Sequence, residues 1–462
     1  MQIYNTLTKQ KEEFLPAGSP VRMFVCGPTV YDYIHIGNAR TFVIFDVVAK
    51  WLRHQGYDLT YIQNITDIED KIITRAAEHN KDVFAYSREL ENAFYKDTQV
   101  LGITSPEYKR ATDHIPEVIK QVQQLTEKGY AYLIEGDGWY FDLTKFPEYG
   151  KLSGRTAMMA DDAVSRIDEN DKKRNRGDFC LWKLSKEGEP SWPSELGAGR
   201  PGWHIEDTAI TEKYLGQQYD LHGGGMDLMF PHHEAEIAQM EAISGKKPFV
   251  KFWMHSGFLV NKNAKMSKSL GNFMTAHEAL EHYSPEALRF YFLSAHYRSP
   301  LDYSEDNLKQ AEAATARLGE CVAKVKRFED EMLVEHNTAI STMIRQSEEA
   351  FAEALDDDFN TPQALAVLFD LLKAINPLLT KRGFDMENGQ RLLEFFEMVH
   401  SVLGVVPGNL PKLPKTLEML IDQRERARHS KDYALADKLR NQIEEQGYKV
   451  DDTTYGPLIK KL

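Results

Sequence analysis

The feature that most constrains the fold is a strand–helix–strand pattern near the start of the chain. The stretch RMFVCGPTVY predicts a short buried strand followed by a Gly-Pro turn. Apolar residues at helical spacing follow between Gly37 and Gly56, and YDLTYIQNIT predicts a second strand. Since three such elements within about 45 residues form a βαβ unit, the chain is predicted to contain a parallel sheet. Ligands bind such sheets at the carboxyl ends of the strands, where CGPT and NITD lie.

The rest of the chain divides into regions of different pattern. Its 462 residues are too many for one compact core and predict two to four domains. The turn-rich stretch GEPSWPSELGAGRPG predicts an insertion between two halves of an α/β sheet domain, and apolar spacing after residue 305 predicts helices. The stretch GVVPGNLPKLPKT predicts a linker to a small terminal module. The expected boundaries are residues 1–114, 115–200, 201–260, 261–304, 305–404 and 413–462.

Charge and cysteine content limit the classes of protein to which the chain can belong. The formal net charge of −14 argues against a protein that coats nucleic acid through its overall charge, but it leaves room for a local basic face. Cys26, Cys180 and Cys321 form no disulfide framework and fit a reducing cytosol. No apolar run is long enough to cross a bilayer, and the N-terminus lacks the pattern of a signal peptide. We therefore expect a cytoplasmic protein with no membrane partner.

A candidate nucleotide site lies at the start of the first predicted helix. His35 and Asn38 flank Gly37 in the sequence His-Ile-Gly-Asn, where a large group of ATP-using enzymes has His-x-Gly-His. The free N–H groups of a helix start attract phosphate, and a donating His can stabilise charge on a reacting phosphate. A bare His-x-Gly is more often an ordinary helix start whose His caps or packs, so this motif alone does not decide.

A second motif, near the other end of the sheet domain, favours a nucleotide site over an ordinary helix start. Lys265 and Lys268 lie in NKNAKMSKSLGN, a polar loop from which two lysines can reach a triphosphate and neutralise the leaving pyrophosphate. Alone, such a stretch reads as a solvated lysine loop. The two motifs, in this order along one chain, resemble the paired signature of class I aminoacyl-tRNA synthetases.

A third constellation is the stretch GGGMDLMFPHHEAE. Its glycines allow close backbone approach, Asp227 can accept hydrogen bonds from a ribose, and Pro231 suits the first turn of a helix. His232 and Glu236 then share one helix face, a spacing that suits two ligands of one metal ion. Two further side chains are expected to point elsewhere: His233 and Glu234. A lone His-x-x-x-Glu is more often a surface pair, and a metal site needs further ligands.

Over essentially its whole length the chain resembles the cysteinyl-tRNA synthetase family of class I enzymes. The matching stretches are FVCGPTVYDYIHIGNART, YIQNITDIEDKI, DFCLWKLSKEGEPSWPSELGAGRPGWHIED, DLHGGGMDLMFPHHEAEIAQ, KMSKSLGN and ALDDDFNTPQALAVLF. The resemblance implies an α/β fold with a class I Rossmann-like parallel-sheet catalytic domain and a connective insertion. An α-helical bundle and a small C-terminal anticodon-binding module would follow, although the tail VDDTTYGPLIKKL departs from the Trp-containing tails of the family.

The resemblance implies one Zn²⁺ per subunit, which the family holds with two cysteines, a histidine and a glutamate. The corresponding residues are Cys26, Asp207, His232 and Glu236, so an aspartate stands where the family usually has its second cysteine. Since zinc accepts carboxylate oxygen at nearly the same distance as nitrogen, we hypothesise that Asp207 is a ligand. The alternative is that Asp207 only supports the other ligands and that zinc is bound weakly or lost.

The resemblance also assigns roles to residues around this site. Those expected to act in catalysis are His35, Asn38, Lys265 and Lys268. Those expected to bind ATP, with its Mg²⁺, are Gly37, Gly225, Asp227 and Lys268. Those expected to line the amino-acid pocket are Gly27, Thr66 and Trp203. Because Asn38 keeps a hydrogen-bond donor but carries no charge, His35 and Lys268 are expected to make the main transition-state contacts.

The implied reaction is the two-step ligation of L-cysteine to tRNA(Cys) through a cysteinyl adenylate made from ATP. Zinc would separate cysteine from serine, since it binds thiolate at neutral pH and leaves an alcohol protonated. We expect a monomer whose C-terminal module touches the anticodon through a basic helix face with Arg424, Arg428 and Lys431. A charged helix face is, however, usually just solvated.

Three other functions stay open at this point. A ligase of related build that joins cysteine to an amino sugar would not need residues 413–462. A small nucleotidyltransferase would be shorter and would lack the WHIED and PHHEAE stretches. A catalytically impaired RNA-binding paralogue is suggested only by Asn38 and Asp207, and the intact KMSKS stretch argues against it.

Overall fold

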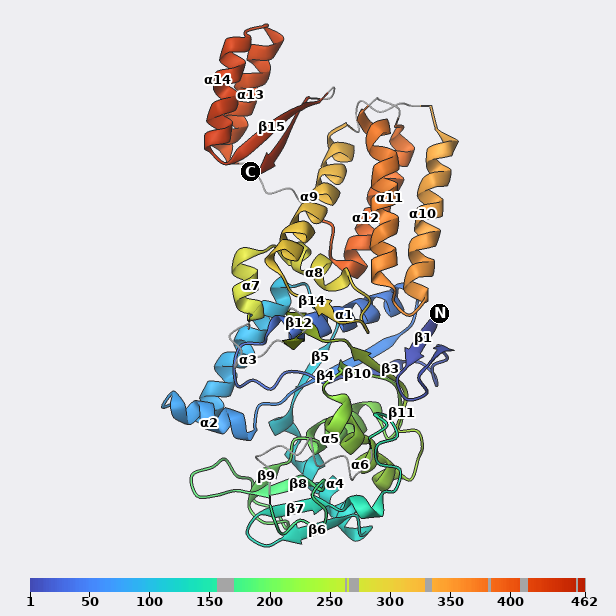
Figure 1. Cartoon of the computed structure of the whole chain (residues 1–462), viewed down its shortest axis with the longest axis vertical. Helices are drawn as coiled ribbons and strands as arrows, with labels where there is room; N and C mark the ends of the chain where they lie inside the picture. The colour runs from blue at the N-terminus through green and yellow to red at the C-terminus, as the bar shows by residue number, and fades with distance from the viewer. Residues whose placement is uncertain are drawn as a thin grey trace. The chain divides into compact units, whose positions relative to one another are not determined.

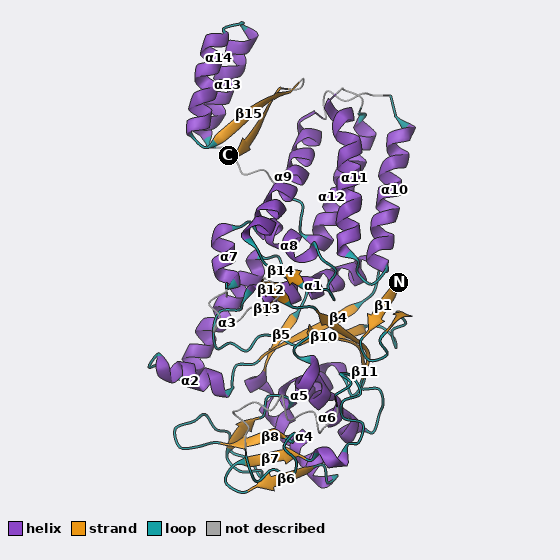
Figure 2. Ribbon diagram, in the orientation of Figure 1, coloured by secondary structure: helices purple, strands orange, loops and turns teal. Residues whose placement is uncertain are grey.

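The computed structural model describes most of the chain. The described residues are 1–155, 170–261, 264–265, 274–328, 335–380, 384–407, 414–453 and 456–461. They form two compact units, Met1–Ala311 with Glu353–Pro362, and Glu312–Ala352 with Gln363–Leu462. Figure 1 traces the chain by residue number and Figure 2 separates its helices from its strands. Each unit is described by itself.

The N-terminal unit is built on a five-stranded parallel sheet, which confirms the prediction from the strand–helix–strand pattern. Its strands, in spatial order, are β11 (Val250–Ser256), β10 (Tyr219–Gly225), β3 (Val21–Val25), β4 (Leu59–Ile65) and β5 (Glu107–Arg110). All four neighbouring pairs of this sheet are parallel. Since β4 and β11 lie on opposite sides of the central pair β3 and β10, the strand order reverses there. Ligands bind beyond the carboxyl ends of the strands at such a switch point.

One face of the sheet is covered by α1 (Ile36–His54), which joins β3 to β4. Its apolar residues are buried along almost its whole length because α7 (Ala276–His282) and α8 (Pro285–Leu293) pack against it. A buried ion pair joins α1 to α8, with Asp46 Oδ2 and Arg289 Nη1 3.0 Å apart. This ion pair holds the layer that carries the predicted nucleotide motif.

The opposite face of the sheet carries a second helical layer (Figure 1). Its helices are α4 (Ile115–Glu127), α5 (Ile205–Leu215) and α6 (Glu234–Ser244). An antiparallel sheet packs with them, in the order β6 (Ala131–Ile134), β7 (Gly138–Phe141), β8 (Phe179–Leu184) and β9 (Gly199–Pro201). Phe141, Phe179 and Trp182 share one hydrophobic core with residues of α5 and α6. The region predicted as an insertion therefore folds onto the sheet domain, while its exact boundaries stay predictions.

Shorter elements complete the N-terminal unit. The strands are β1 (Gln2–Asn5), β2 (Gln10–Glu13), β12 (Leu259–Asn261), β13 (Ala264–Lys265) and β14 (Leu301–Asp302). Two helices, α2 (Asp70–Glu78) and α3 (Val83–Val100), follow β4. Single 3₁₀ turns lie at Ala111–His114 and Leu143–Lys145.

The predicted start of the helix after the triple glycine is wrong in detail. α6 begins at Glu234, and Pro231 lies before it in the π-helical turn Met229–His233. Phe230, which is buried, has an extended backbone inside this turn and interrupts the helix. The predicted pairing of His232 with Glu236 is nevertheless present, since His232 Nε2 lies 3.0 Å from Glu236 Oε1.

Four long helices dominate the C-terminal half of the chain. They are α9 (Glu305–Phe328), α10 (Thr338–Asp356), α11 (Thr361–Thr380) and α12 (Met386–Leu403). By length and composition, Thr361–Leu379 of α11 is apolar enough to cross a membrane, but 44% of that stretch is buried inside the structure. Core helices of helical bundles have the same property, and α11 buries apolar residues along its length.

The terminal module contains α13 (Lys415–His429), α14 (Tyr433–Glu445), β15 (Tyr448–Thr453) and β16 (Gly456–Lys461). Its basic face differs from the prediction. Lys431 lies beyond the end of α13, and Arg424 is only 2% exposed. Arg424 Nη2 lies 2.7 Å from Asp452 Oδ2, and Arg428 also pairs with Asp452. The hairpin strand β15 thus neutralises part of the charge that the helix pattern alone would leave to solvent.

Candidate active site and metal centre

A cavity of about 210 Å³ lies at the carboxyl ends of the central strands. It brings together residues that are far apart in the sequence and that were predicted to share one site. Those lining it are Cys26, Gly27, His35, Gly37, Asn38, Thr66, Trp203, Asp207, Gly225, Asp227 and His232. Glu236 does not line the cavity but contacts His232 directly. The predicted Lys268 lies outside the described residues, and of Lys265 only the backbone, in β13, is described.

At the mouth of the cavity, the His-Ile-Gly-Asn motif forms the first turn of α1. His35 is the N-cap, and its Nδ1 accepts a hydrogen bond from the Asn38 backbone N–H at 3.2 Å. A Cβ on Gly37 would lie 2.7 Å from the His35 ring, so glycine allows that ring to fold over the helix end. His35 therefore caps the helix and also lines the cavity.

The chain that follows the lysine motif returns to this same place. The Ile36 N–H donates to the Met274 carbonyl at 3.1 Å, and the Ala276 N–H donates to the Ile34 carbonyl at 2.8 Å. His35 forms an isolated antiparallel bridge with Thr275 between these bonds. The residues that close the lysine loop are therefore fixed against the histidine motif by backbone hydrogen bonds.

The wall between the mouth and the cluster of buried side chains is formed by Gly27, Thr66 and Trp203. A Cβ on Gly27 would lie 1.8 Å from the Asn64 carbonyl oxygen, so only glycine fits there. Thr66 Oγ1 donates to Glu206 Oε2 at 2.8 Å. Trp203 is 40% exposed and stacks on His232, with ring centroids 4.6 Å apart. These contacts place one aromatic face and one hydroxyl beside the buried cluster.

The buried cluster contains the four residues that were predicted to bind metal. His232 Nε2 lies 3.0 Å from both Asp207 Oδ2 and Glu236 Oε1, and Cys26 Sγ lies 3.8 Å from the latter oxygen. The four donor atoms all lie within 4.8 Å of one another and all four residues are buried. Asp207 comes from the first turn of α5, so the packing of α5 on α6 brings it to His232.

The donor chemistry of this cluster fits a divalent cation. Within the described part of the chain, Asp207 Oδ1 and Glu236 Oε2 are buried atoms without a hydrogen-bond partner, although His222 Nδ1 lies 3.5 Å from the latter. A buried carboxylate oxygen with no partner is costly, and a metal ion removes that cost. Sulfur, imidazole and carboxylate at this spacing are ligands that Zn²⁺ accepts.

The electrostatics of the cluster also favour a bound cation. Burial and the carboxylates of Glu236 and Asp207 raise the pKa of the Cys26 thiol well above its usual value. Burial alone would lower the pKa of His232, but the same two carboxylates raise it to about 10. Burial raises the pKa of Glu236 to about 7, against the opposing effect of His232. The cluster therefore favours a positive charge at its centre, which a cation supplies.

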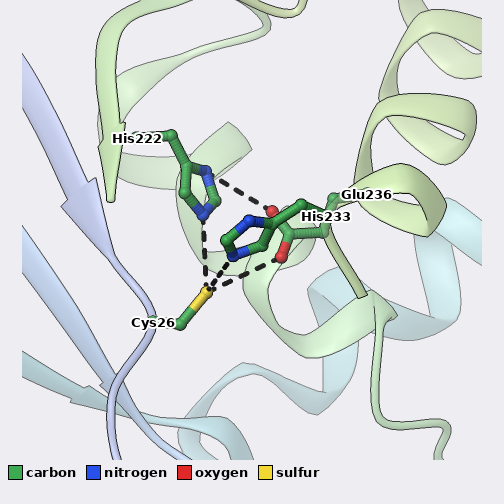
Figure 3. A group of neighbouring side chains, drawn as sticks. All are labelled: Cys26, His222, His233 and Glu236. Carbon is green, nitrogen blue, oxygen red and sulfur yellow. Dashed lines mark hydrogen bonds and ion pairs between the residues drawn. The ribbon is translucent and has the colours of Figure 1, made fainter. Parts of the chain in front are cut away.

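The prediction that His233 points elsewhere is wrong. Its Nε2 lies 3.1 Å from Cys26 Sγ, and His222, which the sequence analysis did not single out, lies 3.4 Å from the same sulfur (Figure 3). Because the π-helical turn replaces the predicted helical turn, both consecutive histidines face the cluster. His222 lies in β10, which pairs with β3, and Cys26 directly follows β3. No local sequence pattern pairs these two residues. Glu234 does point elsewhere, accepting backbone hydrogen bonds from residues 150, 152 and 153.

Comparison with known proteins identifies what the chain is similar to. Residues 15–313 match the family model described as tRNA synthetases class I (C) catalytic domain, and residues 350–407 match the DALR domain. A protein named Cysteine--tRNA ligase from Thermococcus onnurineus is 43% identical, with 100% of this chain and 99% of the relative covered. One of that name from Haemophilus influenzae is 44% identical, with both chains fully covered. Methionyl-tRNA synthetase from Mycobacterium tuberculosis, solved with methionyl-adenylate, has the same fold with a TM-score of 0.61, 16% identity, and 83% and 90% coverage.

Proposed function

Because the chain belongs to the cysteine–tRNA ligase family of class I synthetases, we propose that it joins L-cysteine to tRNA(Cys) at the cavity beyond β3 and β10. The observation that carries this proposal is that the nucleotide motif and the buried donor cluster line one cavity. A site with both parts can hold ATP and a thiol amino acid together. The match also runs through residues 413–462, so an amino-sugar ligase without that module is not favoured.

In the first step, the carboxylate of cysteine attacks the α-phosphorus of Mg²⁺-bound ATP, and pyrophosphate leaves. In the proposal the positive end of the α1 dipole faces the phosphates, and His35 donates to the charge that develops on them. Lys265 and Lys268 neutralise the leaving pyrophosphate. In the proposal Gly37, Gly225 and Asp227 hold the nucleotide, with Asp227 accepting from the ribose.

In the second step, a ribose hydroxyl of the tRNA 3′-terminal adenosine attacks the activated carbonyl, and AMP leaves. The protein forms no covalent bond with either substrate, because positioning and charge stabilisation are sufficient. Asn38 donates hydrogen bonds at the same helix start without carrying charge. The rate therefore depends more on His35 than on Asn38.

Cysteine is selected at the inner end of the cavity. In the proposal Cys26, Asp207, His232 and Glu236 hold one Zn²⁺. When bound, this ion supplies a Lewis acid that favours a thiolate over an alcohol at neutral pH, which separates cysteine from serine. In the proposal Gly27, Thr66 and Trp203 line the pocket around the substrate.

The C-terminal half of the chain is assigned to tRNA. The DALR match at residues 350–407 supports anticodon-side contact by the helices of that region. In the terminal module, Arg424 is held by Asp452, so phosphate contacts fall to exposed cations such as Arg426. A cytoplasmic location and a monomeric state belong to the same proposal.

The deciding experiment is aminoacylation of total tRNA with labelled cysteine, with labelled serine in parallel. We expect ATP-dependent charging with cysteine and none with serine in zinc-supplied protein. Cysteine-dependent exchange of pyrophosphate into ATP, measured without tRNA, tests the first step alone. Folded protein that exchanges pyrophosphate but charges no tRNA would redirect the proposal to another acceptor, and protein that does neither would overturn it.

A further inference from the structure

The buried cluster offers a metal ion two overlapping donor sets. The outer set is Cys26, Asp207, His232 and Glu236, and the inner set is Cys26, His222, His233 and Glu236. Cys26 and Glu236 belong to both. Asp207 and His232 of the outer set line the cavity. His222 and His233 of the inner set are not among the described residues that line it, and both are 0% exposed. The inner set therefore meets the cavity only through Cys26, and its two histidines lie behind that wall.

The geometry of the inner set fits one tetrahedral ion. With a Zn–S distance of about 2.3 Å and a Zn–N distance of about 2.0 Å, tetrahedral geometry places sulfur and nitrogen about 3.5 Å apart. Cys26 Sγ lies 3.4 Å from His222 Nε2, 3.1 Å from His233 Nε2 and 3.8 Å from Glu236 Oε1. Figure 3 shows these four side chains facing one another.

Hydrogen bonds behind the inner histidines orient them as ligands. His222 Nδ1 lies 2.6 Å from the Tyr219 hydroxyl. His233 Nδ1 lies 2.8 Å from His255 Nε2, and His255 Nδ1 lies 2.9 Å from Thr6 Oγ1. When each Nδ1 carries the ring proton and donates it backwards in this network, the lone pair of each Nε2 faces the sulfur. Histidine ligands of metals are generally held by such a second hydrogen bond.

The residue at position 207 changes the balance between the two sets. With aspartate there, the outer set has one sulfur, one nitrogen and two carboxylates, whereas the inner set has one sulfur, two nitrogens and one carboxylate. Zn²⁺ and Co²⁺ prefer imidazole and thiolate to carboxylate. A second cysteine at 207 would favour the outer set, so the aspartate of this chain weakens that preference.

We propose that the cluster holds one metal ion in either of two exclusive positions, and that the inner set, Cys26–His222–His233–Glu236, is a second metal site. An ion in the inner site is out of contact with the cavity, so it does not meet a substrate thiol. An ion in the outer site meets the substrate thiol, and this part of the proposal rests on the proposed function. One sulfur and one carboxylate serve both positions, so we expect a single ion that occupies one position at a time.

The test uses the full chain, freed of metal and titrated with Co²⁺ alone, and the readout is the thiolate-to-cobalt charge-transfer band. The variant D207N/H232Q removes the outer set and H222Q/H233Q removes the inner set. We expect D207N/H232Q to keep about one equivalent of Co²⁺ with its thiolate band, and added L-cysteine to leave that band unchanged. In H222Q/H233Q, cysteine should shift the whole band.

Controls separate loss of a site from loss of the fold. His114→Gln replaces a histidine that is 2% exposed and belongs to neither set, so it should change nothing in the titration. Cys26→Ser should abolish the band in every background. Loss of Co²⁺ from folded D207N/H232Q, or a cysteine-dependent shift of its band, would overturn the inner site.

A second measurement covers the case in which D207N/H232Q does not fold. In the wild-type chain, an ion divided between two positions predicts that sub-saturating cysteine shifts a smaller fraction of the band than it shifts in H222Q/H233Q. Equal fractions in the two proteins would overturn the proposal, as would two ions bound per wild-type chain. Charging of tRNA by the wild type is measured separately, so a failed inner site leaves the proposed function standing.

Discussion

The mouth of the cavity and the buried donor cluster are built in different ways. At the mouth, four consecutive residues supply the histidine, the glycine and the helix start, and a hydrogen bond from Asn38 to His35 closes the motif on itself. In the cluster, the donors come from the end of β3, from α5, from β10, from a π-helical turn and from α6. One region is a local structure, and the other exists only when the whole sheet domain has folded.

The difference teaches where substitutions are tolerated. His35 and Asn38 are half-buried, so water can satisfy a donor that loses its partner. In the cluster every donor is buried, and an unpaired polar atom there is costly. A change such as aspartate at position 207 must therefore be compensated by neighbours, and His222 and His233 are placed to do so.

The largest expected effect is the loss of the shared sulfur. Cys26→Ser removes the only thiolate from both donor sets and should weaken Zn²⁺ binding by about 1000-fold, part of the large free energy that such sites provide. Zinc content by atomic emission and cysteine-dependent pyrophosphate exchange should fall together. Cys180→Ser, which changes a buried cysteine outside the cluster, is the matched control. Unchanged zinc content in Cys26→Ser would refute the shared-ligand arrangement.

Substitutions at the mouth of the cavity should change the rate of adenylate formation more than the free energy of unfolding. His35→Ala should slow adenylate formation by about 100-fold, because a donor to the developing charge is lost. It should also cost about 1 kcal/mol of unfolding free energy, because the helix cap is lost. His35→Asn should restore stability but not rate, since asparagine caps helices and carries no charge. Full activity in His35→Asn would show that capping is the whole role of this residue.

Two glycine substitutions compare a new Cβ that collides with a backbone carbonyl and a new Cβ that collides with a side-chain ring. Gly27→Ala should destabilise the protein by about 2 kcal/mol, because its Cβ meets the Asn64 carbonyl at 1.8 Å. Gly37→Ala should cost less, because the closest neighbours of its Cβ, at 2.7 and 2.8 Å, are atoms of the His35 ring, which can move away. Urea unfolding of both variants measures the difference, and pyrophosphate exchange reports the displaced His35. Equal destabilisation by the two would contradict this comparison.

The smallest expected effect is a change in the zinc affinity of the buried cluster. Asp207→Cys supplies a second thiolate to the outer set and should tighten Zn²⁺ binding by about tenfold, since soft ligands favour this ion. Competition with a chromogenic chelator measures the change. Asp207→Glu keeps the carboxylate and is the matched control. No gain in affinity for Asp207→Cys would indicate that residue 207 does not contact the ion.

Local patterns predicted much of the fold. The strands around Cys26 and Thr66 and the helix between them follow from apolar spacing and glycine punctuation, and the parallel pairing of β3 with β4 confirms that prediction. The family motifs brought Asp207, His232 and Glu236 together before any distance was known. Sequence spacing failed where a side chain's direction depends on packing, as with His233, whose turn is reshaped by the buried Phe230.

The terminal module shows the same limit. Helical spacing placed Arg424, Arg428 and Lys431 on one face, but the helix ends at His429 and the hairpin that follows brings Asp452 to the arginines. Ion pairing across 24 or more residues has no local signature. The charge left to meet RNA is therefore a tertiary property.

By itself the sequence determined the parallel sheet, the nucleotide motif at a helix start and the residue types of the donor cluster, because each depends on neighbours within a few turns of chain. Tertiary structure decided that His222 and His233 share Cys26 and Glu236 with the predicted ligands, and that two buried carboxylate oxygens lack a hydrogen-bond partner among the described residues. The reason is physical. Burial sets the cost of a charge, and burial arises only when distant segments pack together.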